Sequence, residues 1–257
     1  MNSTDVLRQL DAERKSLCRG GETIEVLSDV TRLTSPDGTQ HSVIFSSLTA
    51  DTADTVIARE AAHYRTLGVT AEWKAYRHDQ PADLVARLER EGFSPGPVEA
   101  VVVLDLTAPP KWIQRTGGPT VIRVDRIDQL PLFRQAVEEV FKKDWSFTIS
   151  QLAEAIRAGS TDHRAYVAMD GDLPVSIGRL YLHPKSAFGG LYGGGTIERF
   201  RGRGFYRAVV AARARDAMAA GAKYLIVDAL PTSRPTLEKM GFIHVTDTWP
   251  CELRSPM

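Results

Sequence analysis

The sequence predicts an α/β protein with mixed, largely antiparallel sheets flanked by helices, arranged as two similar domains in tandem. Segments with strand spacing and helix spacing alternate along the chain, and one order of elements occurs in both halves. The 257 residues are enough for two domains of about 100 to 150 residues each. We expect domains at residues 1–107 and 120–257, joined by a proline- and glycine-rich linker at 108–119.

The second half is an ordered series of strands and helices. Apolar residues three or four apart predict helices, and short apolar runs between glycines and prolines predict strands. Asp170-Gly171 is a turn of the kind that joins two antiparallel strands. The predicted elements are strands 120–126, 164–169, 173–182, 187–197 and 224–227, helices 129–143, 149–158, 205–221 and 234–240, and a last strand pair around Trp249.

A segment rich in glycine and arginine precedes the most regular of these helices. Residues 196–206 read Thr-Ile-Glu-Arg-Phe-Arg-Gly-Arg-Gly-Phe-Tyr, and helical spacing begins at Phe205. A helix start has backbone N–H groups without partners and a partial positive charge, and glycine lets a ligand approach the backbone. The segment therefore predicts a phosphate-binding loop, and the alternative is a basic helix start that only faces solvent.

At this loop the sequence resembles the GNAT (GCN5-related N-acetyltransferase) superfamily, over residues 120–253. The family's donor motif reads Q/R-x-x-G-x-G/A, and the segment from Arg201 to Tyr206 matches it except at the last position. The resemblance implies acetyl-CoA as donor, and the spacing of the two cysteines indicates no metal. The resemblance also implies that the 187–197 strand parts from its neighbour and that its backbone holds the acyl carbonyl and the pantetheine arm. The donor-binding residues we expect are Thr196, Ile197, Arg201, Gly202, Arg203, Gly204, Phe205, Tyr206 and Ser233.

Two positions depart from the family pattern. Tyr206 stands where the motif has a small residue, so its ring either narrows the diphosphate site or points along the helix toward the core, and we favour the second. Many members carry a tyrosine four residues before the Gly of Gly-Phe, where it protonates the departing thiolate, but here that residue is Leu237. Either another acid acts, or the thiolate leaves through solvent, or the site is not catalytic. Such an acid is typically worth about 100 to 10,000-fold in rate.

Asp228 and Tyr192 are the predicted catalytic residues. Asp228 ends the strand after the main helix and is our first candidate for the base that deprotonates an amine, although an aspartate that binds loop N–H groups is the alternative. Tyr192 is a candidate acid or substrate contact, unless strand alternation turns it into the core. His183 and Glu198 are weaker candidates, because surface loops and helix-start electrostatics also explain them.

The 187–197 strand contains five glycines, which is unusual for a strand unless a ligand or another backbone must come close. Close approach of the pantetheine arm would explain them, and a bulged or loosely ordered strand is the alternative. Trp145 and Phe147 lie in the connection that covers the acceptor in many family members, although packing in the core is equally consistent with them.

The first half is similar to a degenerate copy of the second. A helix at 3–18 and strands at 23–33 and 41–48 come first; the repeated order then follows as helix 52–67, strand 72–76, helix 82–91 and strand 100–106. The segment 48–54 before the first repeated helix has no glycine and carries two acidic residues, which would repel a diphosphate. We therefore expect a degenerate GNAT-like N-terminal domain that serves as a structural partner or as a wall of the acceptor site. Coincidental repetition of a common pattern is the alternative.

The composition argues against several other classes of protein, namely nucleic-acid-binding, metal-binding and membrane proteins. The chain has 32 basic and 32 acidic residues and a pI near 7.0, so a general nucleic-acid coat is not expected, although arginines crowd residues 199–215. Cys18 and Cys251 show no metal-ligand spacing and support no disulfide. We expect a soluble, cytoplasmic protein without a membrane partner, because no apolar run approaches the roughly 20 residues of a membrane span.

These observations lead us to expect a GNAT-type N-acetyltransferase. It would transfer an acetyl or other acyl group from acetyl-CoA to a primary amine of a small-molecule acceptor. One alternative is a non-catalytic acyl-CoA-binding sensor, which Leu237 and Tyr206 favour. Another is a transferase that uses a different acyl carrier, such as aminoacyl-tRNA. The sequence does not select the acceptor, and a homodimer is left open.

Overall fold

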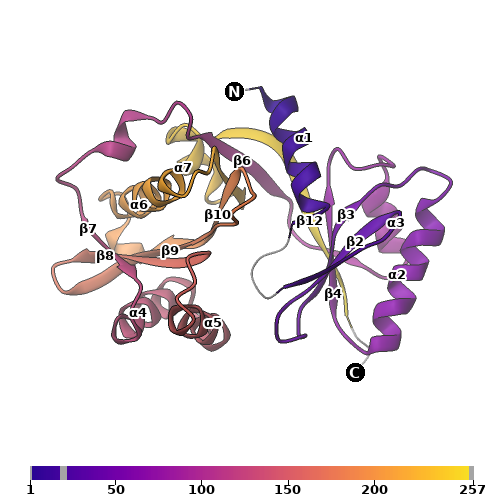
Figure 1. The fold of residues 1–257 in the computed structure, drawn as a ribbon, viewed down its shortest axis with the longest axis horizontal. Helices are drawn as coiled ribbons and strands as arrows, with labels where there is room; N and C mark the ends of the chain where they lie inside the picture. The colour runs from indigo at the N-terminus through magenta and orange to yellow at the C-terminus, as the bar shows by residue number, and fades with distance from the viewer. Residues whose placement is uncertain (1, 18–21, 255–257) are drawn as a thin grey trace. The chain divides into compact units, whose positions relative to one another are not determined.

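The computed structural model describes residues 2–17 and 22–254, and the chain divides into two compact units (Figure 1). Unit 1 comprises residues 1–102 and 228–257, and unit 2 comprises residues 103–227. The chain therefore passes from one unit to the other twice, once within a strand of the first half and once within a strand of the second.

The units do not follow the chain order of the predicted domains, whose boundaries stay a prediction. The units differ from the predicted domains in the C-terminal segment, because residues 228–257 cluster with the first half of the chain. The physical reason is β12 (Ile243–Leu253), which pairs antiparallel with β4 (Ala71–Tyr76) from Thr248–Tyr76 to Leu253–Ala71. A strand that exchanges backbone hydrogen bonds over this length becomes part of the sheet that it joins.

The described strands of unit 2 follow the order β11-β10-β9-β8-β7. All neighbours pair antiparallel except β10 and β11, which pair parallel. The bounds are β7 Thr120–Val124, β8 His163–Asp170, β9 Leu173–Tyr181, β10 Phe188–Thr196 and β11 Tyr224–Ala229. The predicted hairpin between β8 and β9 is confirmed, and Gly171 at its turn has a φ of 61°.

Helices cover both faces of this sheet (Figure 1). Ala165 and Val167 of β8 pack in a cluster with α4 (Leu130–Phe141) and α5 (Ser146–Arg157). Tyr166 between them points to the other face, where its hydroxyl donates to Asp216 of α6 (Phe205–Ala219) at 2.7 Å. The period-two alternation of a strand thus assigns the α4–α5 layer and α6 to opposite faces. Short 3₁₀ segments are η1 Lys111–Gln114, η2 Ile127–Gln129 and η3 Glu198–Phe200.

The described strands of unit 1 follow the order β1-β2-β3-β4-β12, and β5 also pairs with β12. Trp73 of β4 and Cys251 of β12 are buried in one cluster with residues of α2 and α3. The bounds are β1 Thr23–Val26, β2 Val30–Thr34, β3 His41–Ser46, β5 Ser94–Pro95, β6 Glu99–Asp105, α1 Ser3–Arg14, α2 Ala53–Leu67, α3 Leu84–Arg90 and α7 Arg234–Lys239.

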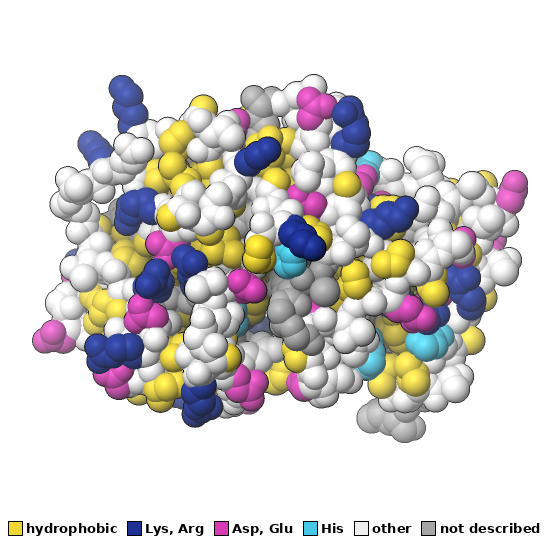
Figure 2. Space-filling model, in the orientation of Figure 1, with side chains coloured by type: hydrophobic (Ala, Val, Ile, Leu, Met, Phe, Trp, Pro, Cys, Tyr) yellow, Lys and Arg dark blue, Asp and Glu magenta, His cyan; other side chains and the backbone are white. Residues whose placement is uncertain are grey.

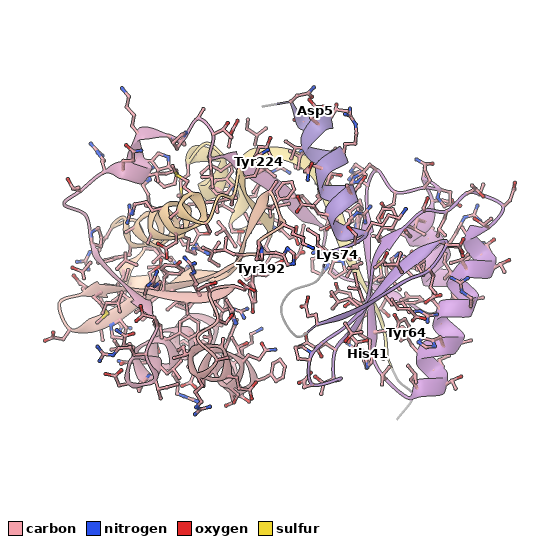
Figure 3. The ribbon with its side chains drawn as sticks, in the orientation of Figure 1. Asp5, His41, Tyr64, Lys74, Tyr192 and Tyr224 are labelled. Atoms are coloured by element: carbon pink, nitrogen blue, oxygen red, sulfur yellow. The ribbon has the colours of Figure 1, made fainter. Side chains whose placement is uncertain are left out.

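A buried carboxylate lies in the core of unit 1. Glu60 of α2 is fully buried and accepts hydrogen bonds from Arg32 at 2.6 and 3.0 Å and from Arg59 at 2.9 Å. Tyr64, one helical turn later, is buried near His41, with 6.1 Å between the ring centroids (Figure 3). Burial raises the pKa of Tyr64 above its usual range. Paired arginines make burial of the Glu60 charge tolerable.

The N-terminal predictions need two corrections. The helix predicted for 3–18 ends at Arg14, and its cap is Asn2, whose side chain accepts the N–H of Thr4 at 3.0 Å. Residue 18 lies outside the described part of the chain. The single strand predicted for 23–33 is two antiparallel strands, β1 and β2, joined by a tight turn in which Leu27 N–H donates to Val30 O at 2.9 Å.

The predicted last strand pair around Trp249 is instead the single strand β12. Pro250 lacks a donor but does not end the strand, because its carbonyl still accepts the N–H of Gly96 at 2.7 Å. The repeated order of elements is confirmed: α2, β4 and α3 in the first half correspond in order to α6, β11 and α7 in the second.

Candidate functional site

The glycine–arginine loop leads from β10 to the start of α6 in unit 2. Gly202 and Gly204 have φ angles of 76° and 88°, a conformation that favours glycine. Gly204 is the N-cap residue of α6 and offers no side-chain cap. A Cβ atom built on either glycine would meet nothing within 4 Å. The loop backbone is therefore open to a ligand.

The N–H groups of residues 202–207 make no hydrogen bond within the described parts of the chain. The first N–H of the helix with an acceptor is that of Ala208, which donates to Gly204 O at 3.0 Å. These donors lie at the positive end of the α6 dipole. This arrangement is suited to a phosphate group.

Two arginines of the loop are exposed and only weakly engaged. The Nε atom of Arg201 donates a hydrogen bond to Thr196 O at 3.2 Å. The Nη2 atom of Arg203 lies 3.1 Å from Asp170 Oδ2. An exposed pair of this kind is worth about 0–1 kcal/mol. Both guanidinium groups can therefore turn toward an arriving anion at small cost.

The other predicted loop residues support its backbone. Thr196 is buried, and its hydroxyl lies 2.7 Å from that of Ser176. Ile197 is buried and donates its N–H to Val175 O at 2.9 Å, while Phe205 anchors the first turn of α6 in the core. Their side chains hold the loop in place, which leaves ligand contact to the backbone.

β10 and β11 part before the chain reaches the loop. In the described structure they pair only from Phe188–Tyr224 to Gly190–Ile226. From Leu191 to Thr196, β10 pairs with β9 alone. The edge of β10 that turns away from β9 is thus not covered by β11 over this stretch.

β10 also contains a bulge. Tyr192 pairs with Arg179 and Gly195 pairs with Ile177, so Gly193 and Gly194 together face the single residue Gly178. A bulge bends its strand and redirects its backbone groups. The bulge lies within the part of β10 that has separated from β11.

The glycines of β10 are explained by the protein's own packing. A Cβ atom on Gly190 would lie 2.7 Å from the Tyr192 ring, and one on Gly195 would lie 2.4 Å from Val140. A Cβ on Gly193 would lie 3.3 Å from Arg179. Close approach of side chains therefore accounts for these glycines without a ligand. The strand is bulged, as the alternative explanation of its glycines supposed.

The ring of Tyr206, which we expected to point along the helix toward the core, is half-buried and packs against β10. Its ring lies 3.1 Å from where a Cβ on Gly194 would be, and its hydroxyl raises the pKa of the nearby Arg213 against the larger effect of burial. The ring is thus packed between α6 and β10. It does not close the loop formed by Gly202 and Gly204, whose Cβ directions are open.

Asp228 forms an ion pair that the sequence did not lead us to expect. Its carboxylate is bonded to Lys74 of β4, and the two side chains are 19% and 24% exposed (Figure 3 labels Lys74). Burial, with Asp228 and Glu72 nearby, raises the pKa of Glu99 despite the opposing charge of Lys74. The ammonium occupies Oδ2, so Asp228 can accept a proton only at its other oxygen or after the pair opens. The signal in the sequence was a lysine on the polar face of a strand whose other face is apolar.

Tyr192, which Figure 3 labels, is the first of a row of rings on the face of unit 2 opposite α6. Its ring meets Tyr181 edge to face at 5.0 Å, and Tyr181 stacks on His163 at 4.1 Å. Arg179 lies over the rings of Tyr181 and Trp145 at 5.6 and 5.5 Å. All five side chains are half-buried, so Tyr192 is not turned into the core.

Leu237 lies in α7 and Ser233 directly precedes this helix, which clusters with unit 1. Ser233 is the N-cap residue but makes no side-chain cap; its hydroxyl donates to Leu230 O at 3.1 Å. Leu237 is fully buried, so no acid acts from this position. Ser233 therefore shares no compact unit with the loop residues, and its role in donor binding stays a prediction.

A separate cavity of about 340 Å³ lies beside the loop in unit 2. Glu138 and Glu139 of α4 line it together with Ile197 and Arg199. Arg199 already pairs with Glu139 at 3.3 Å. Because the acidic wall would repel phosphate, we do not assign this cavity to the donor.

No group of histidine, cysteine or acidic side chains that could hold a metal ion is found in the described residues. Among the same residues no helix has the length and apolar character needed to cross a membrane. Basic and acidic side chains are interspersed on the face shown in Figure 2. Cys251 is buried, and burial raises the pKa of its thiol to about 12.

Comparison with solved structures identifies the fold. A GCN5-related N-acetyltransferase from Kribbella flavida superposes with a TM-score of 0.65 at 12% identity, over 99% of this chain and 94% of that one. A second, from Sphaerobacter thermophilus, gives 0.60 at 15% identity, over 100% and 87%. A tandem GNAT protein from the clavulanic acid biosynthesis pathway gives 0.59 at 11% identity, over 94% and 86%.

No family model and no curated protein sequence matches the chain. The structural similarity spans both halves, although identity is low. At such identity the likeness establishes the fold and leaves the reaction to be argued from the site.

Proposed function

We propose that this chain, which has the GNAT fold, is an acyltransferase that transfers an acetyl group from acetyl-CoA to a primary amine of a small-molecule acceptor. One observation carries the proposal: the part of β10 that has separated from β11 is followed, after the short segment η3, by the N–H groups of residues 202–207 at the start of α6. A ligand with a diphosphate at one end and an amide-containing arm matches this sequence of donors and acceptors.

Each part of the donor would have a defined partner in unit 2. The diphosphate would accept the loop N–H groups, and Arg201 and Arg203 would turn toward it. The amides of the pantetheine arm would bond to the edge of β10 that β11 leaves uncovered. The thioester carbonyl would lie at a β10 N–H, which would stabilise negative charge on its oxygen.

The reaction requires two proton movements. The amine nitrogen loses a proton and attacks the thioester carbon; a C–N bond forms, the C–S bond breaks, and the departing thiolate takes up a proton. We retain Asp228 as the proposed base and Tyr192 as the proposed acid or substrate contact. Like Ser233, Asp228 clusters with unit 1, so its role as base rests on the sequence alone. Because Leu237 is buried, protonation by solvent is the alternative route for the thiolate.

A non-catalytic acyl-CoA sensor is the second candidate. Two observations favour it: the position of the usual acid is a buried leucine, and Asp228 is already paired with Lys74. A sensor would keep the loop and the open β10 edge, since both serve binding alone.

Calorimetric titration with acetyl-CoA and with CoA tests the donor site first. Micromolar binding followed by thiol release in the presence of an amine from a broad panel would support the transferase. Binding without release across the panel would favour the sensor. Binding of neither ligand would remove the CoA proposal and make aminoacyl-tRNA the next carrier to test.

A further inference from the structure

Arg213 of α6 is a fully buried cation. It is 1% exposed, its Nε lies 3.4 Å from Val209 O, and its Nη1 donates to Arg179 O at 3.2 Å. Within the described residues no carboxylate pairs with Arg213 and its Nη2 meets no acceptor in hydrogen-bond geometry, although the nearby Tyr206 hydroxyl favours its charge. Burial lowers the pKa of Arg213, although an arginine stays protonated near neutral pH.

This burial is unfavourable for folding. A buried charge without a counter-charge loses its hydration and gains little in return. Arg213 also interrupts an apolar stripe on α6 that otherwise holds Val209, Val210, Ala214 and Ala217. A hydrophobic side chain of similar length would pack at this position at lower cost.

The guanidinium lies against the bulge of β10. A Cβ on Gly178, which faces the bulge, would lie 2.6 Å from Arg213 Cζ. A Cβ on the bulge residue Gly194 would lie 3.4 Å from Nη2, the nitrogen without a partner. Glycine at both positions allows this approach. The positive charge is thus fixed beside the part of β10 that has separated from β11.

We propose that Arg213 is a positioning residue of the acyl site, which holds the bulge of β10 and places positive charge beneath its backbone N–H groups. In the low-dielectric interior this charge would strengthen the attraction of those N–H groups for negative charge on the thioester oxygen. Arg213 does not touch the donor; it acts through the bulge. The inference rests on the proposed acyl-CoA function.

Arg213→Met is the main variant, and Arg215→Met is its matched control on the exposed side of the same helix. The readout is the carbonyl stretching frequency of bound [1-¹³C]acetyl-CoA, measured by isotope-edited infrared difference spectroscopy. In the wild type and in Arg215→Met the frequency should fall on binding. In Arg213→Met most of this fall should be lost, while calorimetry gives an unchanged affinity for CoA.

Stability separates this role from a structural one. Arg213→Met should unfold at the same temperature as the wild type or higher, because it removes a buried unpaired charge. If an amine acceptor has been found, kcat should fall by about 10-fold or more with an unchanged KM for acetyl-CoA. A purely structural Arg213 would instead lower the melting temperature when replaced.

Arg213→Gln keeps a side-chain donor toward Arg179 O but carries no charge, and it also serves if the Met variant does not fold. It should lose the carbonyl shift as Arg213→Met does. A wild-type shift in either folded variant would overturn the proposal while leaving donor binding intact. Failure of the wild type to bind acetyl-CoA would instead overturn the proposed function, and this inference with it.

Discussion

Gly204→Asp gives a quantitative test of the donor loop. Gly204 has a φ of 88°, and a side chain built on it meets nothing within 4 Å, so the variant has room for its new carboxylate. A non-glycine residue in this conformation costs about 1–2 kcal/mol, which a folded protein of this size tolerates. The variant should therefore fold and be altered chiefly in the charge of its loop.

The expected loss of affinity follows from Coulomb's law. A carboxylate about 5 Å from a phosphate group, at an effective dielectric constant of about 40, repels each unit of negative charge by roughly 1.7 kcal/mol. Two charges on the diphosphate give about 3 kcal/mol, a loss of CoA affinity of about 100-fold or more. Part of this loss should disappear at high salt, because exposed charges are screened.

Gly221→Asp is the matched control. Gly221 follows the C-terminal end of α6 with a φ of 85° and the same open Cβ direction, so the backbone strain is equal. Its new negative charge lies at the unfavourable end of the helix dipole, so this variant should be at least as destabilised. Calorimetric titration of both proteins with CoA compares them directly. Equal CoA affinity of folded Gly204→Asp and the wild type would refute the loop assignment.

Three further predictions concern acidic side chains of unit 1. Asp228→Asn should lower turnover near neutral pH and leave CoA affinity unchanged; a pH–rate profile identical to the wild type would exclude Asp228 as the base. Because burial raises the pKa of Glu99, the folded state binds its proton more tightly than the unfolded state, and stability falls as pH rises through this range. Glu99→Gln should therefore raise the melting temperature near neutral pH, with no gain below the ordinary glutamate pKa; an equal gain at both pH values would contradict this. Glu60→Ala leaves Arg32 and Arg59 without their buried partner and should cost about 3–5 kcal/mol in urea unfolding, and a loss within experimental error would show that the pair is not buried in solution.

The predictions of helices and turns that agree with the structure depend on residues adjacent in the sequence. The loop and α6 were predictable because glycines with open backbone positions come directly before a regular helical pattern. The turn at Asp170-Gly171 was predictable because two-residue turns specify antiparallel pairing of the strands on either side. The repeated order of helices and strands followed from the same local patterns and led to the tandem arrangement.

The predictions that failed depend on distant residues. β12 was expected as a strand pair, since nothing local shows that residues 243–253 pair with β4. Lys74 and Asp228 are 154 positions apart, and only the sheet brings them into contact. The glycines of β10 suggested a ligand, but their neighbours are side chains of the protein itself, such as Tyr192 and Val140.

The sequence by itself determined most of the elements, the glycine–arginine loop before α6 and the likeness to the GNAT fold, because helix starts, turns and periodicity are properties of adjacent residues. Only the tertiary structure decided which charges are paired and which are buried alone. Arg213 shows the difference: in the sequence it is one arginine of a basic helix, whereas in the fold it is buried against the bulge of β10 with no carboxylate partner among the described residues. Burial and pairing arise from contacts between segments, and no local pattern specifies them.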